Sequence, residues 1–327
     1  MSIFNVFTLL GGLAFFLYGM NMMGDALERK AGTKLKSILA QLTSNTFKGF
    51  LLGLVITAII QSSSATTVMV VGFVNSGIMT LRQATGVIFG ANLGTSVTSW
   101  LLSLTGIEGD NFFIQLAKPS SFTPLLAFIG IILIMFIKKN KHKDTALILI
   151  GFSILMFGME TMSAAVDPLA ESEKFKNVLV LFSNPVIGLL VGTIFTAIVQ
   201  SSSASVGILQ ALTLTGTVTY ATAIPIVMGQ NIGTCVSAMI SSIGASKNAK
   251  RAAVIHLAFN VFGSAMGLGV LYLLKYILRA EFLNGPINMW QIAAMHTVFN
   301  IMTFAVLYPF SFILERIALK LVQEKGK

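Results

Sequence analysis

Charged residues are scarce in this chain. Asp, Glu, Lys and Arg make up 10% of its 327 residues, whereas a soluble domain carries about 25%. Too few polar groups remain to cover a globular surface, which excludes a cytosolic enzyme and a DNA-binding fold. The net charge of +10 does not indicate nucleic acid as a partner, because the basic residues lie in short stretches between apolar runs. With 55% hydrophobic residues and a mean hydropathy of +0.84, the composition predicts an integral membrane protein.

Cysteine is nearly absent as well. The single thiol, Cys235, excludes a disulfide framework and a cysteine-ligated metal site, and no cofactor is expected. The N-terminal stretch 2–23, which contains the first apolar run, has no basic segment at its start and no clear cleavage site. It is therefore predicted to be a membrane helix rather than a signal peptide.

Long apolar runs, by contrast, fill most of the sequence. A helix needs about 20 residues to cross the hydrocarbon core of a bilayer, and seven of the runs suit a single crossing. The other two, residues 49–81 and 185–219, are too long for one crossing and too short for two, and a polar cluster interrupts each of them. We therefore expect an all-α integral membrane protein with about seven transmembrane helices and two re-entrant helical hairpins. The nine runs lie at 3–23, 49–81, 84–104, 122–137, 145–163, 185–219, 221–243, 252–278 and 287–314.

Basic residues gather on one side of this topology. Lys and Arg are concentrated in stretches 25–48, 138–143 and 247–251 and in the C-terminal tail. Acidic residues outnumber basic ones in stretches 105–121 and 164–184. Cytoplasmic loops of membrane proteins carry an excess of Lys and Arg. The pattern predicts a multi-pass protein of the cell inner (plasma) membrane, with its N-terminus outside and its C-terminus in the cytoplasm.

The sequence also repeats itself. A shift of 139 residues aligns residues 12–99 with 151–238 without a gap, and 28 of these 88 positions are identical. The two copies begin on opposite sides of the predicted topology, and inverted repeats of this kind are typical of secondary transporters. We expect a first repeat at 1–138 with its hairpin at 49–81, a second at 139–280 with its hairpin at 185–219, and a final transmembrane helix and tail at 281–327.

Two motifs stand out within the repeat. Gln-Ser-Ser-Ser-Ala at 61–65 falls on the same five residues at 200–204, and Gly-x-Asn-x-Gly-Thr at 90–95 falls on 229–234. This doubled pair of motifs in an apolar chain resembles the type II sodium/phosphate cotransporter family, in its compact bacterial form. The resemblance implies a secondary carrier that takes up inorganic phosphate with sodium by alternating access. Its partners would be phosphate, sodium and the lipid bilayer, and a homodimer is left open.

The chemistry of the motifs fits an anion and a hard cation. No charged residue occurs in 49–81 or 177–246, so an anion there depends on hydroxyls and on free N–H groups at a helix start. The predicted phosphate-binding residues are the motif side chains Gln61, Ser62, Ser63, Ser64, Gln200, Ser201, Ser202 and Ser203. The predicted sodium ligands are neutral oxygen donors in and after the motifs, namely Gln61, Thr66, Asn92, Thr95, Gln200, Ser205, Asn231 and Thr234.

Other interpretations of the serines remain open. Small residues in membrane helices often serve only close helix packing, although two copies in register weaken that view. A nucleophilic serine would need a base, and neither hairpin contains His or Lys, so no enzyme is expected. A carrier of another oxyanion or small carboxylate, and a non-transporting phosphate sensor or scaffold, are the alternative functions. The sequence does not assign roles to Glu160, His256 or His296.

Overall fold

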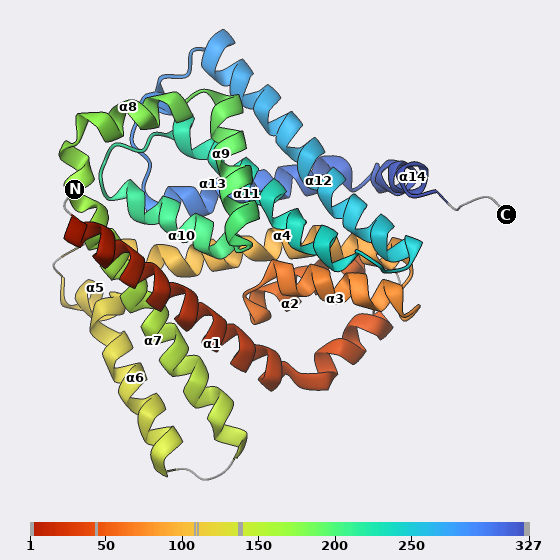
Figure 1. Ribbon diagram of the computed structural model, residues 1–327, viewed down its shortest axis with the longest axis horizontal. Helices are drawn as coiled ribbons and strands as arrows, with labels where there is room; N and C mark the ends of the chain where they lie inside the picture. The colour runs from red at the N-terminus through yellow and green to blue at the C-terminus, as the bar shows by residue number, and fades with distance from the viewer. Residues whose placement is uncertain (1–2, 43–44, 108, 110, 137–139, 324–327) are drawn as a thin grey trace.

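The computed structural model describes residues 3–42, 45–107, 109, 111–136 and 140–323, with the side chains of 31–42 and 140–141 excepted. These residues form a bundle of helices without named β-strands (Figure 1). The α-helices are α1 (Ile3–Leu42), α2 (Thr46–Ile60), α3 (Ser63–Asn75), α4 (Leu81–Ser103), α5 (Phe112–Ala117), α6 (Pro119–Phe136), α7 (Asn140–Val166), α8 (Glu173–Phe182), α9 (Pro185–Val199), α10 (Ser202–Thr213), α11 (Tyr220–Ser241), α12 (Lys247–Tyr272), α13 (Met289–Leu307) and α14 (Ser311–Leu321).

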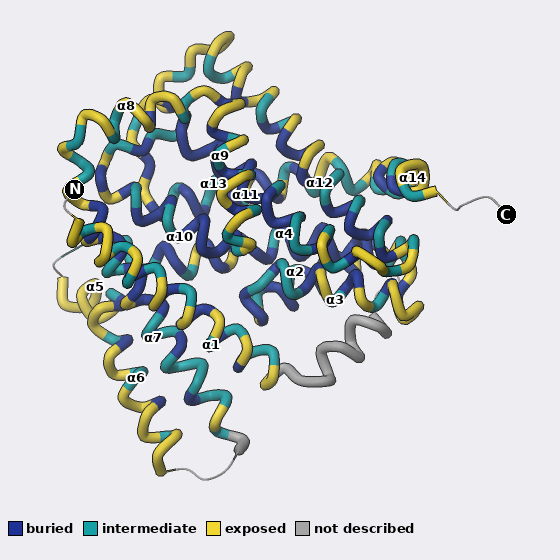
Figure 2. The backbone as a smooth tube through the Cα atoms, viewed as in Figure 1, coloured by how far each residue is buried: buried dark blue, intermediate teal, exposed yellow. Residues whose placement is uncertain are grey.

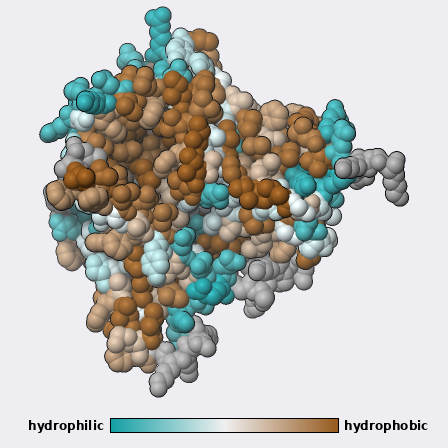
Figure 3. All heavy atoms as spheres, viewed as in Figure 1, coloured by the Kyte–Doolittle hydropathy of each residue, from teal (hydrophilic) through white to brown (hydrophobic). Residues whose placement is uncertain are grey.

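Seven helical segments of the described chain are long and apolar enough to cross a membrane. They lie in α1, α4, α6, α7, α11, α12 and α13, which confirms the expected all-α membrane fold. Buried residues make up 72% of the most apolar window in both α4 and α11, but only 17% of that in α6, so α4 and α11 form the centre of the bundle (Figure 2). The outer surface is largely hydrophobic, as Figure 3 shows for one face, and this is the surface that lipid would cover.

The first helices of the two sequence repeats pack against each other. A Cβ at Gly12 would lie 2.8 Å from the backbone nitrogen of Met162, and one at Gly151 would lie 2.7 Å from that of Met23. Gly12 and Met23 become Gly151 and Met162 after the 139-residue shift, so the two contacts are equivalent. Residue numbers rise along α1 while they fall along α7, so the helices run antiparallel. Only residues without a side chain allow backbones this close.

Each polar motif lies between two short helices, as expected for the hairpins. The first hairpin is α2 followed by α3, and the second is α9 followed by α10 (Figure 1). Asn45 caps α2 and Asn184 caps α9 through their side-chain oxygens, and these asparagines are equivalent in the repeat. α2 packs closely on α4, and α9 packs in the same way on α11. The two hairpins are therefore built alike, although the division into repeats at 1–138 and 139–280 stays a prediction.

The helix ends differ from the sequence expectation at three places. α1 does not stop near residue 23 but continues to Leu42, so Asp25 belongs to a helix rather than to a loop. The stretch 164–184 contains the amphipathic helix α8, which is bent by 100° against α9. The last apolar run is two helices, because α13 ends at Leu307 and α14 follows from Ser311.

Candidate functional site

Both hairpins break at a glutamine in the left-handed backbone conformation. Gln61 ends α2 with φ 60° and ψ 24°, and Gln200 ends α9 with φ 55° and ψ 21°. Residues other than glycine rarely adopt this conformation, because the Cβ approaches the carbonyl oxygen. Equivalent positions of the two repeats thus share an unfavourable geometry, which turns the chain sharply before the serines.

The first serine of each motif starts the next helix. Ser62 accepts a hydrogen bond on its hydroxyl from the N–H of Ala65 at 3.1 Å, and Ser201 accepts one from Ala204 at 3.2 Å. Both serines are therefore N-caps. The N–H groups of the two following serines have no acceptor within the helix, and they lie at the positive end of its dipole.

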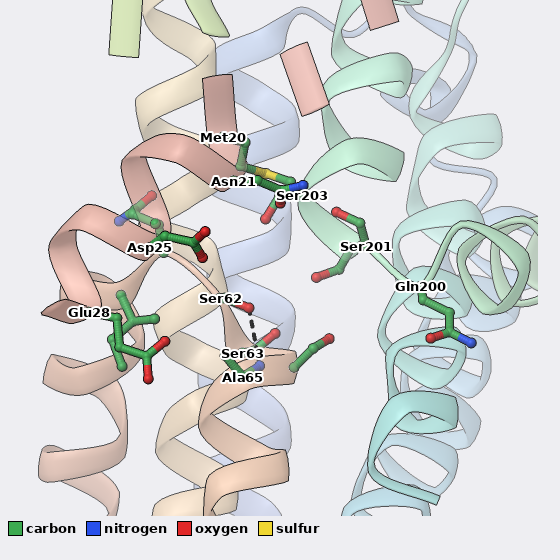
Figure 4. A pocket seen from close by; sticks show the side chains of 15 residues that line it. Met20, Asn21, Asp25, Glu28, Ser62, Ser63, Ala65, Gln200, Ser201 and Ser203 are labelled. Carbon is green, nitrogen blue, oxygen red and sulfur yellow. Dashed lines mark hydrogen bonds between the residues drawn. The ribbon is translucent and has the colours of Figure 1, made fainter. Parts of the chain in front are cut away.

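The two motifs line a single cavity of about 160 Å³, although 139 residues separate them in sequence. Figure 4 shows Ser62 and Ser63 on one side and Ser201 and Ser203 on the other. All eight residues predicted to bind phosphate line this cavity. The geometry therefore supports the prediction that the motifs act together, while phosphate binding by these residues remains a prediction.

The second and third serines have free hydroxyls. Ser63 is 6% exposed, Ser202 is 5% exposed and Ser203 is 7% exposed, yet no hydroxyl of these three forms a hydrogen bond with another described residue. Buried polar groups normally have partners. Because the three side chains line the cavity, their hydroxyls are available to a ligand inside it.

A third element, α1, completes the cavity. Its lining residues include Asn21, Asp25 and Glu28, which are spaced i, i+4 and i+7 and so share one helix face. The sequence prediction missed all three, and it placed Asp25 and Glu28 in a loop because the first helix was expected to end near residue 23. The spacing of three polar residues on one face was the signal that could have identified them.

The two motif glutamines are not equivalent in their surroundings. Gln61 is 8% exposed, whereas Gln200 is exposed. The amide nitrogen Nε2 of Gln61 donates to the carbonyl oxygen of Ala58, which fixes the orientation of the amide. Its Oε1 atom is buried and accepts no hydrogen bond from the described part of the chain. The two hairpins therefore supply different groups to the cavity.

The remaining predicted sodium ligands lie away from this cavity. All six are buried but absent from its lining, namely Thr66, Asn92, Thr95, Ser205, Asn231 and Thr234. The hydroxyl of Thr95 donates to the carbonyl oxygen of Ala91 at 3.2 Å, and Asn92 Nδ2 donates to that of Ile88 at 2.8 Å. Their role in sodium binding stays a prediction.

Asn231 belongs to a polar cluster in the apolar core. Its Nδ2 atom donates to Oδ1 of Asn300 at 2.9 Å, and His296 Nδ1 lies 2.8 Å from the hydroxyl of Ser96. His296 on α13 thus contacts α4, and α12 contacts α11 through Cys235, whose Sγ lies 3.6 Å from the carbonyl oxygen of His256. The asparagines of the repeated pattern His-x-x-Phe-Asn make equivalent contacts, since Asn300 Nδ2 donates to the hydroxyl of Ser96 at 3.5 Å and Asn260 Nδ2 donates to Cys235 Sγ at 3.3 Å.

Comparison with known proteins identifies the family of the chain. A model of the family described as Na+/Pi-cotransporter matches the chain twice, at residues 15–164 and 154–278. The chain is 29% identical over 314 residues to the uncharacterized protein YqeW of Bacillus subtilis, covering 96% of this chain and 97% of YqeW. It is 26% identical over 306 residues to the putative inorganic phosphate export protein YjbB of Escherichia coli K12, covering 92% of this chain and 53% of YjbB. It thus spans about half the length of YjbB.

A shorter match links the chain to an animal protein. Over 98 residues it is 35% identical to the human sodium-dependent phosphate transport protein 2B, which covers 29% of this chain and 14% of that protein. No solved structure matches the chain. The family match and the all-α membrane fold place the chain among the transport proteins. This chain belongs to the Na+/Pi-cotransporter family.

Proposed function

We propose that the protein is a sodium-coupled secondary carrier of inorganic phosphate that works by alternating access. One observation carries the proposal: the Gln-Ser-Ser-Ser motifs of both hairpins line the same cavity. Two helix N-termini, of α3 and α10, begin at these motifs. An anion between them would meet free N–H groups and hydroxyls from two sides.

The size of the cavity favours a small ligand, and the hydrogen-bond donors of its lining favour one that can be released. About 160 Å³ is well below the roughly 300–1,000 Å³ of pockets for drug-sized ligands. Among the described residues, the lining contains no Lys, Arg or His, and its charged members are Asp25 and Glu28. Hydroxyl and backbone donors hold phosphate by hydrogen bonds without a fixed opposite charge, so binding stays reversible, as a carrier requires.

Sodium coupling and inward transport are the finer parts of the proposal. The family description names sodium with phosphate, whereas YjbB is named a putative phosphate export protein. A secondary carrier is reversible, and the gradient of the coupling ion sets its direction. With sodium higher outside the cell, a sodium symporter imports phosphate, and one positive charge crossing 100 mV adds about 2.3 kcal/mol.

The antiparallel packing of α1 on α7 supports an inverted repeat. Helices that run antiparallel through a bilayer start on opposite sides, and each of these two begins one copy of the repeat. We propose that the N-terminus lies outside and the C-terminus lies in the cytoplasm, as the distribution of Lys and Arg predicts. The two copies would then exchange conformations around the shared cavity.

Radiolabelled phosphate flux in proteoliposomes tests the proposal. Uptake should rise with an inward sodium gradient and fall to background when potassium replaces sodium. Sodium-dependent flux of sulfate or a small carboxylate, without phosphate flux, would instead support the alternative carrier. Phosphate binding without flux under any gradient would support a sensor or scaffold.

A further inference from the structure

In the part of the chain that the structure describes, the lining of the cavity between the motifs has two carboxylates and no cationic side chain. Asp25 and Glu28 are the charged residues of its lining, and both project from α1. Figure 4 shows Asp25 reaching from α1 toward Ser62, with Glu28 further along the same helix. Asp25 is exposed and Glu28 is half-buried, so the carboxylates lie at the open side of the cavity and the serines lie at its buried side.

The cations nearest in sequence are engaged elsewhere. Arg29 Nε lies 2.9 Å from Oδ1 of Asp144, and Lys30 Nζ donates to the hydroxyl of Thr145 at 2.9 Å. Both contacts go to α7, on a different side of α1 from the cavity. Among the described side chains, none forms an ion pair or hydrogen bond with Asp25 or Glu28.

Two residues with neutral oxygen atoms, Gln61 and Ile60, line the same cavity. Gln61 lines the cavity and is 92% buried, yet its Oε1 atom accepts no hydrogen bond from the described residues. The carbonyl oxygen of Ile60, at the end of α2, lies 3.4 Å from the position of a Cβ at Gly24, the residue before Asp25. The carbonyl end of a helix attracts positive charge, and its last carbonyls lack partners within the helix.

We infer that Asp25 and Glu28, together with Gln61 Oε1 and the carbonyl end of α2, form a sodium site beside the serines. Carboxylate, amide and carbonyl oxygens are the ligands that hard cations prefer. A phosphate anion next to two unneutralised carboxylates is repelled, so a cation at this position allows both charges to occupy one cavity. The inference rests on the proposed function for the identity of the ion.

The site belongs to one repeat alone. Shifted by 139 residues, Asp25 corresponds to Ala164 and Glu28 to Asp167, and neither lines the cavity. Gln200, the counterpart of Gln61, is exposed. The first hairpin and α1 therefore supply the ligands of this one sodium site, while both hairpins supply the anion donors.

Binding of ²²Na⁺ to the purified full-length protein, without phosphate, tests the site directly. Asp25→Asn should require at least tenfold more sodium for half-saturation, and Glu28→Gln should have a smaller effect in the same direction. Asp25→Glu keeps the charge and should retain more of the affinity than Asp25→Asn. Glu173→Gln is the matched control, since Glu173 is exposed and pairs with Lys176 outside the cavity; it should bind sodium as the wild type does.

A second measurement distinguishes an ion ligand from a structural residue. In wild-type protein, binding of ³²P-phosphate should rise with sodium. In Asp25→Asn, phosphate binding should depend less on sodium. In sodium-free potassium buffer this variant should bind phosphate more strongly than the wild type, because one negative charge that repels phosphate is gone. A misfolded variant would lose phosphate binding at every sodium concentration.

The site assignment fails if a double variant, Asp25→Asn with Glu28→Gln, binds ²²Na⁺ as tightly as the wild type. It also fails if potassium or calcium displaces the bound ²²Na⁺ as well as unlabelled sodium does. The proposed function fails separately. Sodium binding that depends on Asp25, in a protein without phosphate flux, would support the site and contradict phosphate transport.

Discussion

Replacing one buried serine in each motif tests whether both hairpins hold the same anion. Ser63 and Ser202 line the cavity, and their hydroxyls have no partner among the described residues. A hydrogen bond to a charged group contributes about 1.5–3 kcal/mol, and about 1.4 kcal/mol is tenfold in affinity. Ser63→Ala and Ser202→Ala should therefore each weaken phosphate binding by about 10- to 150-fold, without affecting stability, because the folded protein loses no internal hydrogen bond.

Titration of the purified variants with ³²P-phosphate at saturating sodium measures this effect. Ser76→Ala is the control, because Ser76 is exposed at the end of α3 and its hydroxyl donates to the carbonyl oxygen of Phe73, outside the cavity; this variant should bind phosphate normally. Ser62→Ala removes an N-cap as well, so it should also lower the stability by about 1 kcal/mol. Normal affinity in both Ser63→Ala and Ser202→Ala would refute the reasoning and make the serines packing residues.

Three further changes have distinct expected outcomes. Gln61→Leu should weaken sodium-dependent phosphate transport more than Gln200→Leu, because Gln61 is buried in the cavity and Gln200 is exposed; equal effects would contradict the asymmetry. Asn231→Leu should raise the sodium concentration needed for half-maximal transport more than it raises the phosphate concentration needed for half-maximal transport. An unchanged dependence of transport on sodium would show that Asn231 is not a sodium ligand. Gly19→Ala should lower the melting temperature, because its Cβ would collide with the backbone of Leu155 on α7, whereas Gly11→Ala meets nothing within 4 Å and should be neutral.

The hairpins and the paired serine motifs could be predicted from the sequence because their signals are local. An apolar run of hairpin length with a polar break leaves few alternatives, and the 139-residue repeat doubles the evidence. The caps Asn45 and Asn184 also follow from residue type. The left-handed conformation of Gln61 and Gln200 could not be predicted, because glutamine has no preference for it and only the surrounding packing enforces it.

The contribution of α1 to the cavity could not be predicted for a different reason. Asp25 is followed by Arg29 and Lys30, and this mixture of charges is typical of a loop at the membrane surface. In the structure the helix continues, and its contacts with α7 turn Arg29 and Lys30 away from the cavity. Asn92 and Asn231 are a different case. Their residue type and their repetition suggested an ion site, but in the structure their side chains form hydrogen bonds with Ile88 and Asn300. Which face of a helix lies toward the cavity depends on tertiary packing.

The number of phosphate ions bound per chain tests the central claim most directly, because two motifs that share one cavity hold one anion. Equilibrium dialysis of the purified protein with ³²P-phosphate in saturating sodium should give one phosphate per chain. Both Ser63→Ala and Ser202→Ala should weaken that same site without changing the stoichiometry. Two phosphates per chain, with each variant removing one of them, would show that the motifs bind separately and would contradict the shared site.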